Sequence, residues 1–143
     1  MSGVRRRRTW TPAAIRAVLA SLAFDANGLI PSVIQDAESG EVLTLCYLTD
    51  AALRRSLRTG LVHVFRRSKQ RVMLKGETSG HVQTIRELRI DCEGKSLLLR
   101  VRQRVAGCHT GYFTCYFRES TPRGGLRARG RRAFDPRRVY RTA

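Results

Sequence analysis

The sequence predicts an α+β fold with a mostly antiparallel sheet and two short helices. Two segments repeat apolar residues at helical spacing, most other segments are alternating or β-branched apolar runs, and polar turns with glycine separate them. With 143 residues, of which 42% are hydrophobic, the chain is long enough to enclose one core. We expect one folded domain over residues 11–118, between a basic N-terminal tail (1–10) and a basic, mobile C-terminal tail (119–143).

The first helix is expected over residues 12–23, because Thr11 and Pro12 are typical of a helix cap and a first helical residue. The second is expected to begin at Thr49 or Asp50 and to end at Gly60, which can adopt the left-handed conformation of a helix stop. Its inward stripe is Ala52, Leu53 and Leu57.

The remaining elements are expected to be strands. Residues 29–35 and 42–48 are apolar runs joined by a polar turn that ends in Gly40 and Glu41, so we expect a hairpin, with Cys46 of its second strand in the core. The other expected strands cover residues 61–65, 72–74, 81–91, 97–101 and 112–118. A basic turn, residues 66–71, separates the first two of these.

The formal net charge of +17 is concentrated at the two ends of the chain. The first ten residues hold four arginines and no acid, and residues 119–143 hold eight arginines against two acids. Such tails bury little apolar surface and can bind phosphate polyanions such as nucleic acid. The alternative is a solubilising extension without a specific partner.

Cysteine usage and hydropathy indicate the cellular setting. The chain has four cysteines, and it shows neither an apolar leader nor a run of 18 apolar residues. We therefore expect a reduced, cytoplasmic protein that does not enter a membrane.

Two of the cysteines form a candidate metal site. Sulfur atoms that share one zinc ion lie within roughly 4 Å of each other, whereas the seven residues from Cys108 to Cys115 would span about 23 Å if extended. The chain must therefore reverse between them, and Gly111 can adopt the required backbone angles. Cys92, in a polar context, is the best candidate for a third ligand, which leaves the fourth position to water, as in catalytic zinc sites. The alternative is three ordinary reduced cysteines.

A second candidate site is the loop at residues 75–80, with the sequence Lys-Gly-Glu-Thr-Ser-Gly. Backbone amides, hydroxyls and an ammonium group in one tight loop are suited to holding an anion such as phosphate. Arg66, Arg67 and Lys69 precede the loop closely and add positive charge. The alternative is an ordinary polar turn.

Taken together, these stretches resemble the phosphoribosyl-AMP cyclohydrolases of histidine biosynthesis, over roughly residues 24–118. The residues that carry the resemblance are Gly28-Leu29-Ile30-Pro31, Gln35-Asp36-Ala37, Gly40-Glu41-Val42-Leu43, Lys75-Gly76-Glu77-Thr78-Ser79-Gly80, Val82-Gln83, Asp91-Cys92, Cys108-His109-Thr110-Gly111 and Cys115.

The resemblance implies an intertwined homodimer with zinc bound across the interface, held by Cys92 of one subunit and by Cys108 and Cys115 of the other. The family also places Mg²⁺ on an Asp-Cys-Asp-x-Asp segment. Here Asp91 and Glu93 remain as oxygen donors, but Lys95 replaces the last acid. An ammonium group is not a magnesium ligand, so we expect Lys95 to repel this ion or to take its place.

The implied activity is zinc-dependent hydrolytic opening of the N1–C6 bond in the adenine ring of phosphoribosyl-AMP. His109 is the expected proton carrier, or alternatively a structural group that orients its loop. The expected phosphate-binding residues are Arg67, Ser68, Lys75, Gly76, Glu77, Thr78, Ser79 and Gly80. A second hypothesis is a divergent relative that keeps the zinc fold and binds nucleic acid or a protein through its tails. The sequence assigns no role to His63 or His81.

Overall fold

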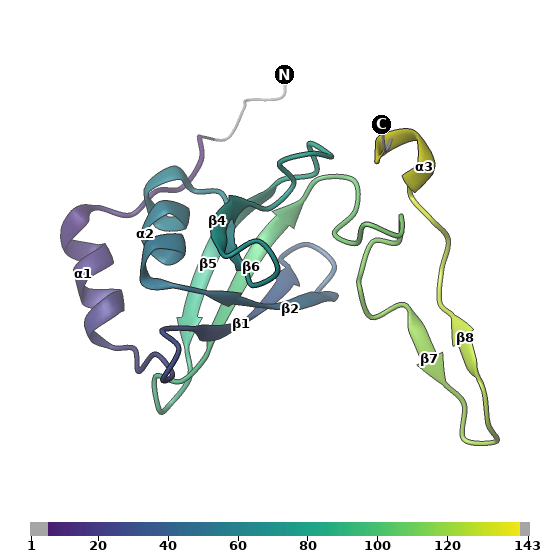
Figure 1. Ribbon diagram of the computed structural model, residues 1–143, viewed down its shortest axis with the longest axis horizontal. Coiled ribbons are helices and arrows are strands. Elements are labelled where there is room, and N and C mark those ends of the chain that lie inside the picture. The colour runs from purple at the N-terminus through teal and green to yellow at the C-terminus, as the bar shows by residue number, and fades with distance from the viewer. Residues whose placement is uncertain (1–5, 141–143) are drawn as a thin grey trace.

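The computed structural model describes residues 6–140, which form three helices and eight strands (Figure 1). Residues 1–5 of the predicted N-terminal tail and residues 141–143 of the predicted C-terminal tail lie outside this range. In order, the elements are α1 (Pro12–Ala20), β1 (Ile30–Asp36), β2 (Val42–Leu48), α2 (Asp50–Thr59), β3 (His63–Arg66), β4 (Arg71–Leu74), β5 (Gln83–Ile90), β6 (Leu97–Gln103), β7 (Arg118–Ser120), β8 (Leu126–Ala128) and α3 (Pro136–Val139). The predicted α+β class is confirmed.

The central sheet has the strand order β2-β1-β6-β5. The predicted hairpin of β1 and β2 is confirmed, β5 and β6 also pair antiparallel, and β3 and β4 form a separate antiparallel ribbon. The pairing of β1 with β6 is parallel and was not predicted. Hydrophobic periodicity identifies strands but not which strands pair. β1 and β6 are separated in the chain by five other elements of the fold, so no local signal indicates their pairing.

Helices α1 and α2 lie together on one side of the sheet and close the core (Figure 1). Thr49 caps α2 by accepting a hydrogen bond from the Ala52 amide, and Gly60 ends the helix in the left-handed conformation, as predicted. Leu53 and Leu57 are fully buried against the sheet, and each contributes about 2 kcal/mol through removal of its side chain from water. Helix α1 ends at Ala20, three residues earlier than predicted, because the chain turns there and Ala23 donates to the Gly94 carbonyl at 2.8 Å.

The prediction of a strand over residues 112–118 is wrong. This segment is irregular and bent, and only its last residue, Arg118, belongs to a strand. It is held by a hydrogen bond from Cys115 N to Leu43 O at 2.8 Å and one from the Thr114 hydroxyl to Val42 O at 2.6 Å. Its aromatic and β-branched composition suits a strand, but its partners are two isolated carbonyls rather than a ladder.

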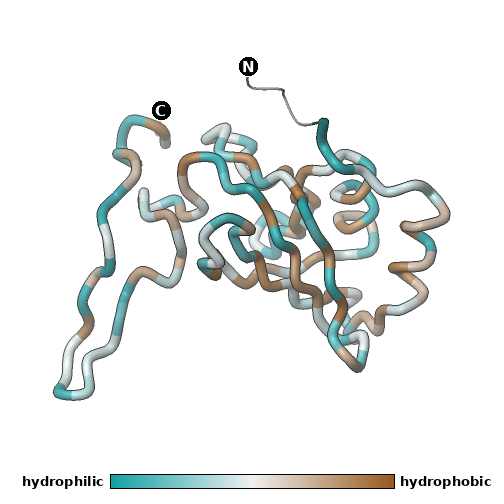
Figure 2. The backbone as a smooth tube through the Cα atoms, turned by 180° about the vertical axis from the view of Figure 1, so that it is seen from behind, coloured by the Kyte–Doolittle hydropathy of each residue, from teal (hydrophilic) through white to brown (hydrophobic). Residues whose placement is uncertain are grey.

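The described part of the predicted C-terminal tail contains the β7–β8 hairpin and α3, so the described chain has three helices instead of two. The hairpin is mostly hydrophilic and projects from the domain, and the chain then returns towards the sheet (Figure 2). Few apolar residues mark this segment, so hydrophobic periodicity did not predict its structure. None of the helices among residues 6–140 is long and apolar enough to span a membrane.

Candidate active site

The thiol turn, residues 107–115, reverses the chain between two cysteines as the sequence predicted. Gly107 N donates to Phe113 O at 2.9 Å, and Cys108 N donates to Tyr112 O at 3.2 Å. Gly111 has a φ of 99°, which glycine adopts without strain. The turn thereby places both cysteine side chains on the same side of the molecule, next to β2.

The two thiols of this turn lie beside each other. Cys108 is buried, and its Sγ atom is 2.9 Å from the Thr110 hydroxyl. Burial raises the pKa of the Cys115 thiol, a hydrogen bond with Thr44 lowers it, and the neighbouring Cys108 raises it further. A half-buried thiol whose deprotonation is opposed by burial and by a neighbouring thiol matches a site in which a bound cation stabilises the thiolate.

Cys46 was predicted to lie in the core. It packs against the core but is only half-buried. Burial raises the pKa of its thiol to about 12, with nearby Lys75 opposing this effect. The side chain therefore stays protonated at neutral pH, unlike a metal-binding thiolate.

Cys92 lies at the opposite end of the sheet from the thiol turn. It is exposed in the turn that joins β5 to β6, whereas Cys108 follows the far end of β6 (Figure 1). The seven residues of β6 alone separate these ends by about 20 Å. Within residues 6–140 no three His, Cys, Asp or Glu side chains are grouped to hold a metal ion. One chain therefore does not bring the three predicted zinc ligands together.

The predicted magnesium residues lie in the acidic turn, residues 91–96. The Asp91 carboxylate accepts the backbone amides of Glu93 and Lys95, each at 2.9 Å, and the Ser96 hydroxyl at 2.6 Å. These hydrogen bonds, that from Ser96 most strongly, lower the pKa of Asp91. The Lys95 ammonium is 2.9 Å from the Glu93 carboxylate. The charged side chains of this turn are thus paired with groups of the turn itself.

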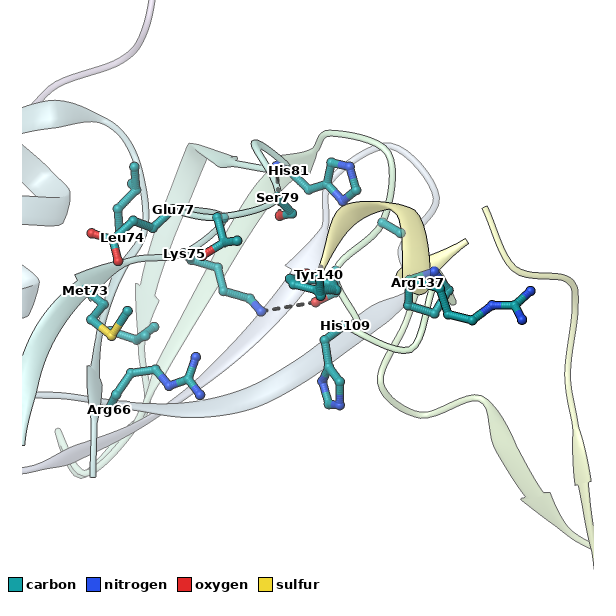
Figure 3. A pocket seen from close by; sticks show the side chains of 16 residues that line it. Arg66, Met73, Leu74, Lys75, Glu77, Ser79, His81, His109, Arg137 and Tyr140 are labelled. Atoms are coloured by element: carbon teal, nitrogen blue, oxygen red, sulfur yellow. Dashed lines mark hydrogen bonds between the residues drawn. The ribbon is translucent and has the colours of Figure 1, made fainter. Parts of the chain in front are cut away.

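A cavity of about 600 Å³ brings the 75–80 loop and the thiol turn together (Figure 3). Five of the six loop residues line it, together with Arg66, His109 and residues from the C-terminal end. The Lys75 ammonium donates to the Gly107 carbonyl at 3.1 Å, which links the loop directly to the thiol turn. Arg67 and Ser68 lie outside this cavity, and the Arg67 guanidinium instead covers the Tyr47 ring at 4.5 Å.

His109 is exposed and borders two cavities. It lines the large cavity and also a smaller one of about 220 Å³, which Thr44, Cys46 and Lys75 share. The imidazole therefore faces both the cavity of the 75–80 loop and the smaller cavity beside Cys46, where it can contact a bound molecule.

Sequence reasoning missed two buried glutamines that support this site. Gln83 donates to the side chain of Gln103 at 2.7 Å, and Gln103 donates in turn to the carbonyls of His81, Arg104 and Ala106. The backbone that leads into the thiol turn is thereby fixed. The Val82-Gln83 pair was part of the resemblance, but an amide within an apolar run does not reveal its distant partner.

The two histidines without an assigned role differ in position. His81 lines the large cavity, and burial followed by the charge of Arg104 lowers its pKa. His63 is buried on β3, its Nδ1 atom is 2.9 Å from Leu61 O, and burial lowers its pKa too. Of these two histidines, only His81 is placed to affect a molecule in the cavity.

A concave site of this size, with a few convergent polar groups, is typical of small-ligand binding, and comparison with known proteins gives its family. Residues 44–117 match the family model described as phosphoribosyl-AMP cyclohydrolase. The protein of that name from Natronomonas pharaonis is 46% identical over 119 residues, covering 83% of this chain and 96% of the relative. The one from Haloarcula marismortui is 47% identical over 119 residues, with the same coverage. The chain belongs to the phosphoribosyl-AMP cyclohydrolase family.

A longer relative is also similar. The histidine biosynthesis bifunctional protein HisIE of Thermoanaerobacter pseudethanolicus is 44% identical over 123 residues, which are 86% of this chain. The match spans only 56% of that relative's length. The similarity thus concerns one part of the bifunctional protein.

Proposed function

We propose that this chain hydrolyses the adenine ring of phosphoribosyl-AMP between N1 and C6, a step of histidine biosynthesis. The observation that carries the proposal is the shared cavity, in which the 75–80 loop, His109 and the thiol turn converge. Relatives that carry the name phosphoribosyl-AMP cyclohydrolase support the choice of substrate.

The reaction consumes one water molecule. Its oxygen adds to C6, the C6–N1 bond breaks, and N1 leaves with a proton. A group that takes a proton from the water and returns one to N1 serves both steps. His109 fits this role because its ring borders both cavities and because imidazole is the side chain that ordinarily titrates nearest neutral pH.

The cationic side of the cavity suits the two phosphates of the substrate. Lys75 and Arg66 supply positive charge, and Thr78 and Ser79 supply hydroxyl donors. Lys75 is already bonded to the Gly107 carbonyl, so a bound phosphate would share this ammonium or displace the carbonyl. The volume of about 600 Å³ lies within the usual range for a ligand of nucleotide size.

Zinc fits the thiol turn, where Cys108 and Cys115 would hold it. A bound zinc ion would act as a Lewis acid and lower the pKa of a water molecule bound to it. Cys92 is exposed and far from this turn in its own chain, so it can serve as the third ligand only if it comes from a second copy. We therefore propose a homodimer in which the partner subunit's Cys92 completes each site.

Magnesium does not fit the acidic turn of this chain. The oxygens of Asp91 are engaged by the turn itself, and the Glu93 carboxylate is paired with the Lys95 ammonium. An incoming divalent ion would meet the positive charge of Lys95 where the family pattern has its third oxygen ligand. We propose that Lys95 replaces the ion and holds the turn in place of it.

The test is turnover of phosphoribosyl-AMP, followed by the absorbance change of ring opening, with one equivalent of zinc and no magnesium. Cys108→Ser should abolish turnover, and Cys46→Ala is the matched control because Cys46 borders the site without a metal-binding role. If the wild-type protein shows no turnover with zinc, and none when magnesium is then added, the proposal is wrong. Salt-sensitive binding of nucleic acid in its place would favour the second hypothesis.

A further inference from the structure

We propose that the C-terminal arm, residues 132–140, contributes both structure and a ligand contact to this site. It fixes the thiol turn against the 75–80 loop, and its Tyr140 forms the wall of the cavity that contacts the bound nucleotide. The assignment of a nucleotide rests on the proposed function, but the docking of the arm does not. The sequence predicted this segment as a mobile tail.

The backbone of the arm docks on the thiol turn at Gly111. Ala133 N donates to Gly111 O at 2.7 Å. A Cβ atom on Gly111 would lie 2.5 Å from the Phe134 carbonyl, so only glycine allows this approach. Glycine at position 111 is therefore needed both for the reversal of the thiol turn and for the close approach of the arm.

Arg132 connects the arm to the first thiol. Its Nε atom donates to the Thr110 carbonyl at 2.9 Å, and its guanidinium lies 5.5 Å from the centre of the Tyr112 ring. The Thr110 hydroxyl in turn contacts the Cys108 sulfur at 2.9 Å. Arg132 is thus a positioning residue, which acts on Cys108 through Thr110.

Phe134 connects the arm to the other side of the cavity. Its ring packs edge-on against the His81 ring, with centroids 4.7 Å apart. His81 directly follows the 75–80 loop, and a Cβ atom on Gly76 would lie 2.7 Å from the His81 carbonyl, so the two are closely packed. One segment thereby spans both parts of the site.

The end of the arm lines the cavity itself. Pro136, Arg137 and Tyr140 form part of the lining of the cavity that Lys75 and Arg66 also line (Figure 3). The Arg137 guanidinium pairs with Asp135 at 3.3 Å and extends away from Lys75, so its charge is not directed at the ligand. Tyr140 is 37% exposed and packs 6.2 Å from the Phe134 ring. An aromatic ring near cations matches a ligand with both a base and phosphates.

The β7–β8 hairpin provides a contrast within the same tail. Its Leu126 is 64% exposed, and the hairpin lines neither cavity of the site. The charges of Arg127 and Arg129 are paired with Glu119. Leu126→Ala is therefore a matched control for changes in the arm.

The test uses the full chain in four variants: Arg132→Ala, Arg132→Lys, Tyr140→Ala and Tyr140→Phe. We measure kcat and KM for phosphoribosyl-AMP, the affinity for AMP by calorimetry, and the rate at which iodoacetamide alkylates Cys108 in metal-free protein, assigned by mass spectrometry. Tyr140→Ala should raise KM and weaken AMP binding by about tenfold, as expected for one lost stacking contact, with kcat nearly unchanged. Tyr140→Phe should restore both.

Arg132→Ala should lower kcat and accelerate alkylation of Cys108 severalfold, and Arg132→Lys should recover part of the effect. The inference is overturned if the arm variants behave as Leu126→Ala does. If the wild-type chain shows no turnover, the proposed function fails, whereas the alkylation rates still decide whether the arm docks on the thiol turn.

Discussion

The two cysteine-bearing turns at opposite ends of the sheet are built alike and used differently. Each is closed by a left-handed glycine, Gly111 in the thiol turn and Gly94 in the acidic turn, and each glycine packs against a second segment. Cys108 is buried beside another thiol, whereas Cys92 is exposed. The side chains of the acidic turn bond mainly within the turn, whereas the thiol turn has additional side-chain hydrogen bonds from Lys75 and from Arg132 of the arm.

This difference indicates how a site can be divided between two copies. The buried turn supplies a pocket whose geometry is set before any partner arrives. The exposed turn is held by the hydrogen bonds to Asp91, so it presents its thiol at a defined position, and no group of three potential metal ligands is found among residues 6–140. Rigidity at both ends lowers the entropy lost when two such halves meet.

The largest expected effect comes from mixing two inactive variants. Cys92→Ser and Cys108→Ser should each lose turnover by at least about a hundredfold, because each removes one proposed zinc ligand from every site. After unfolding and refolding together, the mixed dimers carry one intact and one doubly damaged site. Activity should then return to roughly a quarter of the wild-type value, as random pairing in a two-fold symmetric dimer requires.

Two variants that damage the same half of the site give the control. A mixture of Cys108→Ser and Cys115→Ser cannot rebuild any site, and it should stay inactive. Recovery of activity in this control, or no recovery with Cys92→Ser, would contradict sharing between subunits.

A smaller effect is expected from Gly111→Ala. The change forces a left-handed alanine and a clash with the Phe134 carbonyl, so we expect a loss of roughly 2–4 kcal/mol of unfolding free energy or displacement of the arm. Gly40→Ala is the matched control, because Gly40 has a φ of 77° but no atom within 4 Å of its Cβ position. It should lose only about 1 kcal/mol from backbone strain. Urea unfolding measures both, and equal losses would contradict tight docking at Gly111.

Local signals in the sequence predicted the parts of the fold that they control. Thr11 and Thr49 cap their helices, Gly60 ends α2, and Gly111 reverses the thiol turn, because each effect depends on a few neighbouring residues. The convergence of the 75–80 loop with His109 also appears in the structure.

Features that depend on distant partners were not predictable in this way. The parallel pairing of β1 with β6 needs the whole sheet, and the turns at 112–118 follow from two carbonyls on β2. The arm looked mobile because it is rich in arginine, yet Phe134 and Arg132 dock it through contacts with residues more than twenty positions away. Composition reports the average character of a segment and misses a few well-placed anchors.

The acidic turn gives a third, more modest prediction. Lys95→Asp removes the cation and adds an oxygen donor, so this variant should bind Mn²⁺, used as a magnetic substitute for Mg²⁺, at concentrations at which the wild-type chain binds none at this turn. Lys95→Ala is the control, since it removes the charge without adding a ligand. The electron paramagnetic resonance signal of free Mn²⁺ measures binding. Equal binding by the wild-type chain and Lys95→Asp would show that Lys95 does not exclude the ion.

The smallest expected effect is a difference between the arm, which docks on the thiol turn, and the acidic turn in their response to acid. Burial and Arg104 lower the pKa of His81 below its ordinary value of 6.5, so the folded state favours neutral His81. Its contribution to stability is complete above pH 6.5 and is lost as the pH falls from there through the lowered pKa. The pKa of Asp91 is lowered from 3.8, so the acidic turn keeps its contribution until the pH falls below that value.

Between pH 6.5 and 3.8 the arm should therefore loosen while the acidic turn stays intact. Hydrogen-exchange protection measures this directly, because the Ala133 amide reports on the arm and the Lys95 amide reports on the acidic turn. Protection at Ala133 should fall with acidification and protection at Lys95 should not, once intrinsic exchange rates are corrected for pH. His81→Gln should remove the pH dependence at Ala133. A parallel loss at both amides would mean that acid weakens the whole domain, and the two turns would then not differ in the way that their contacts require.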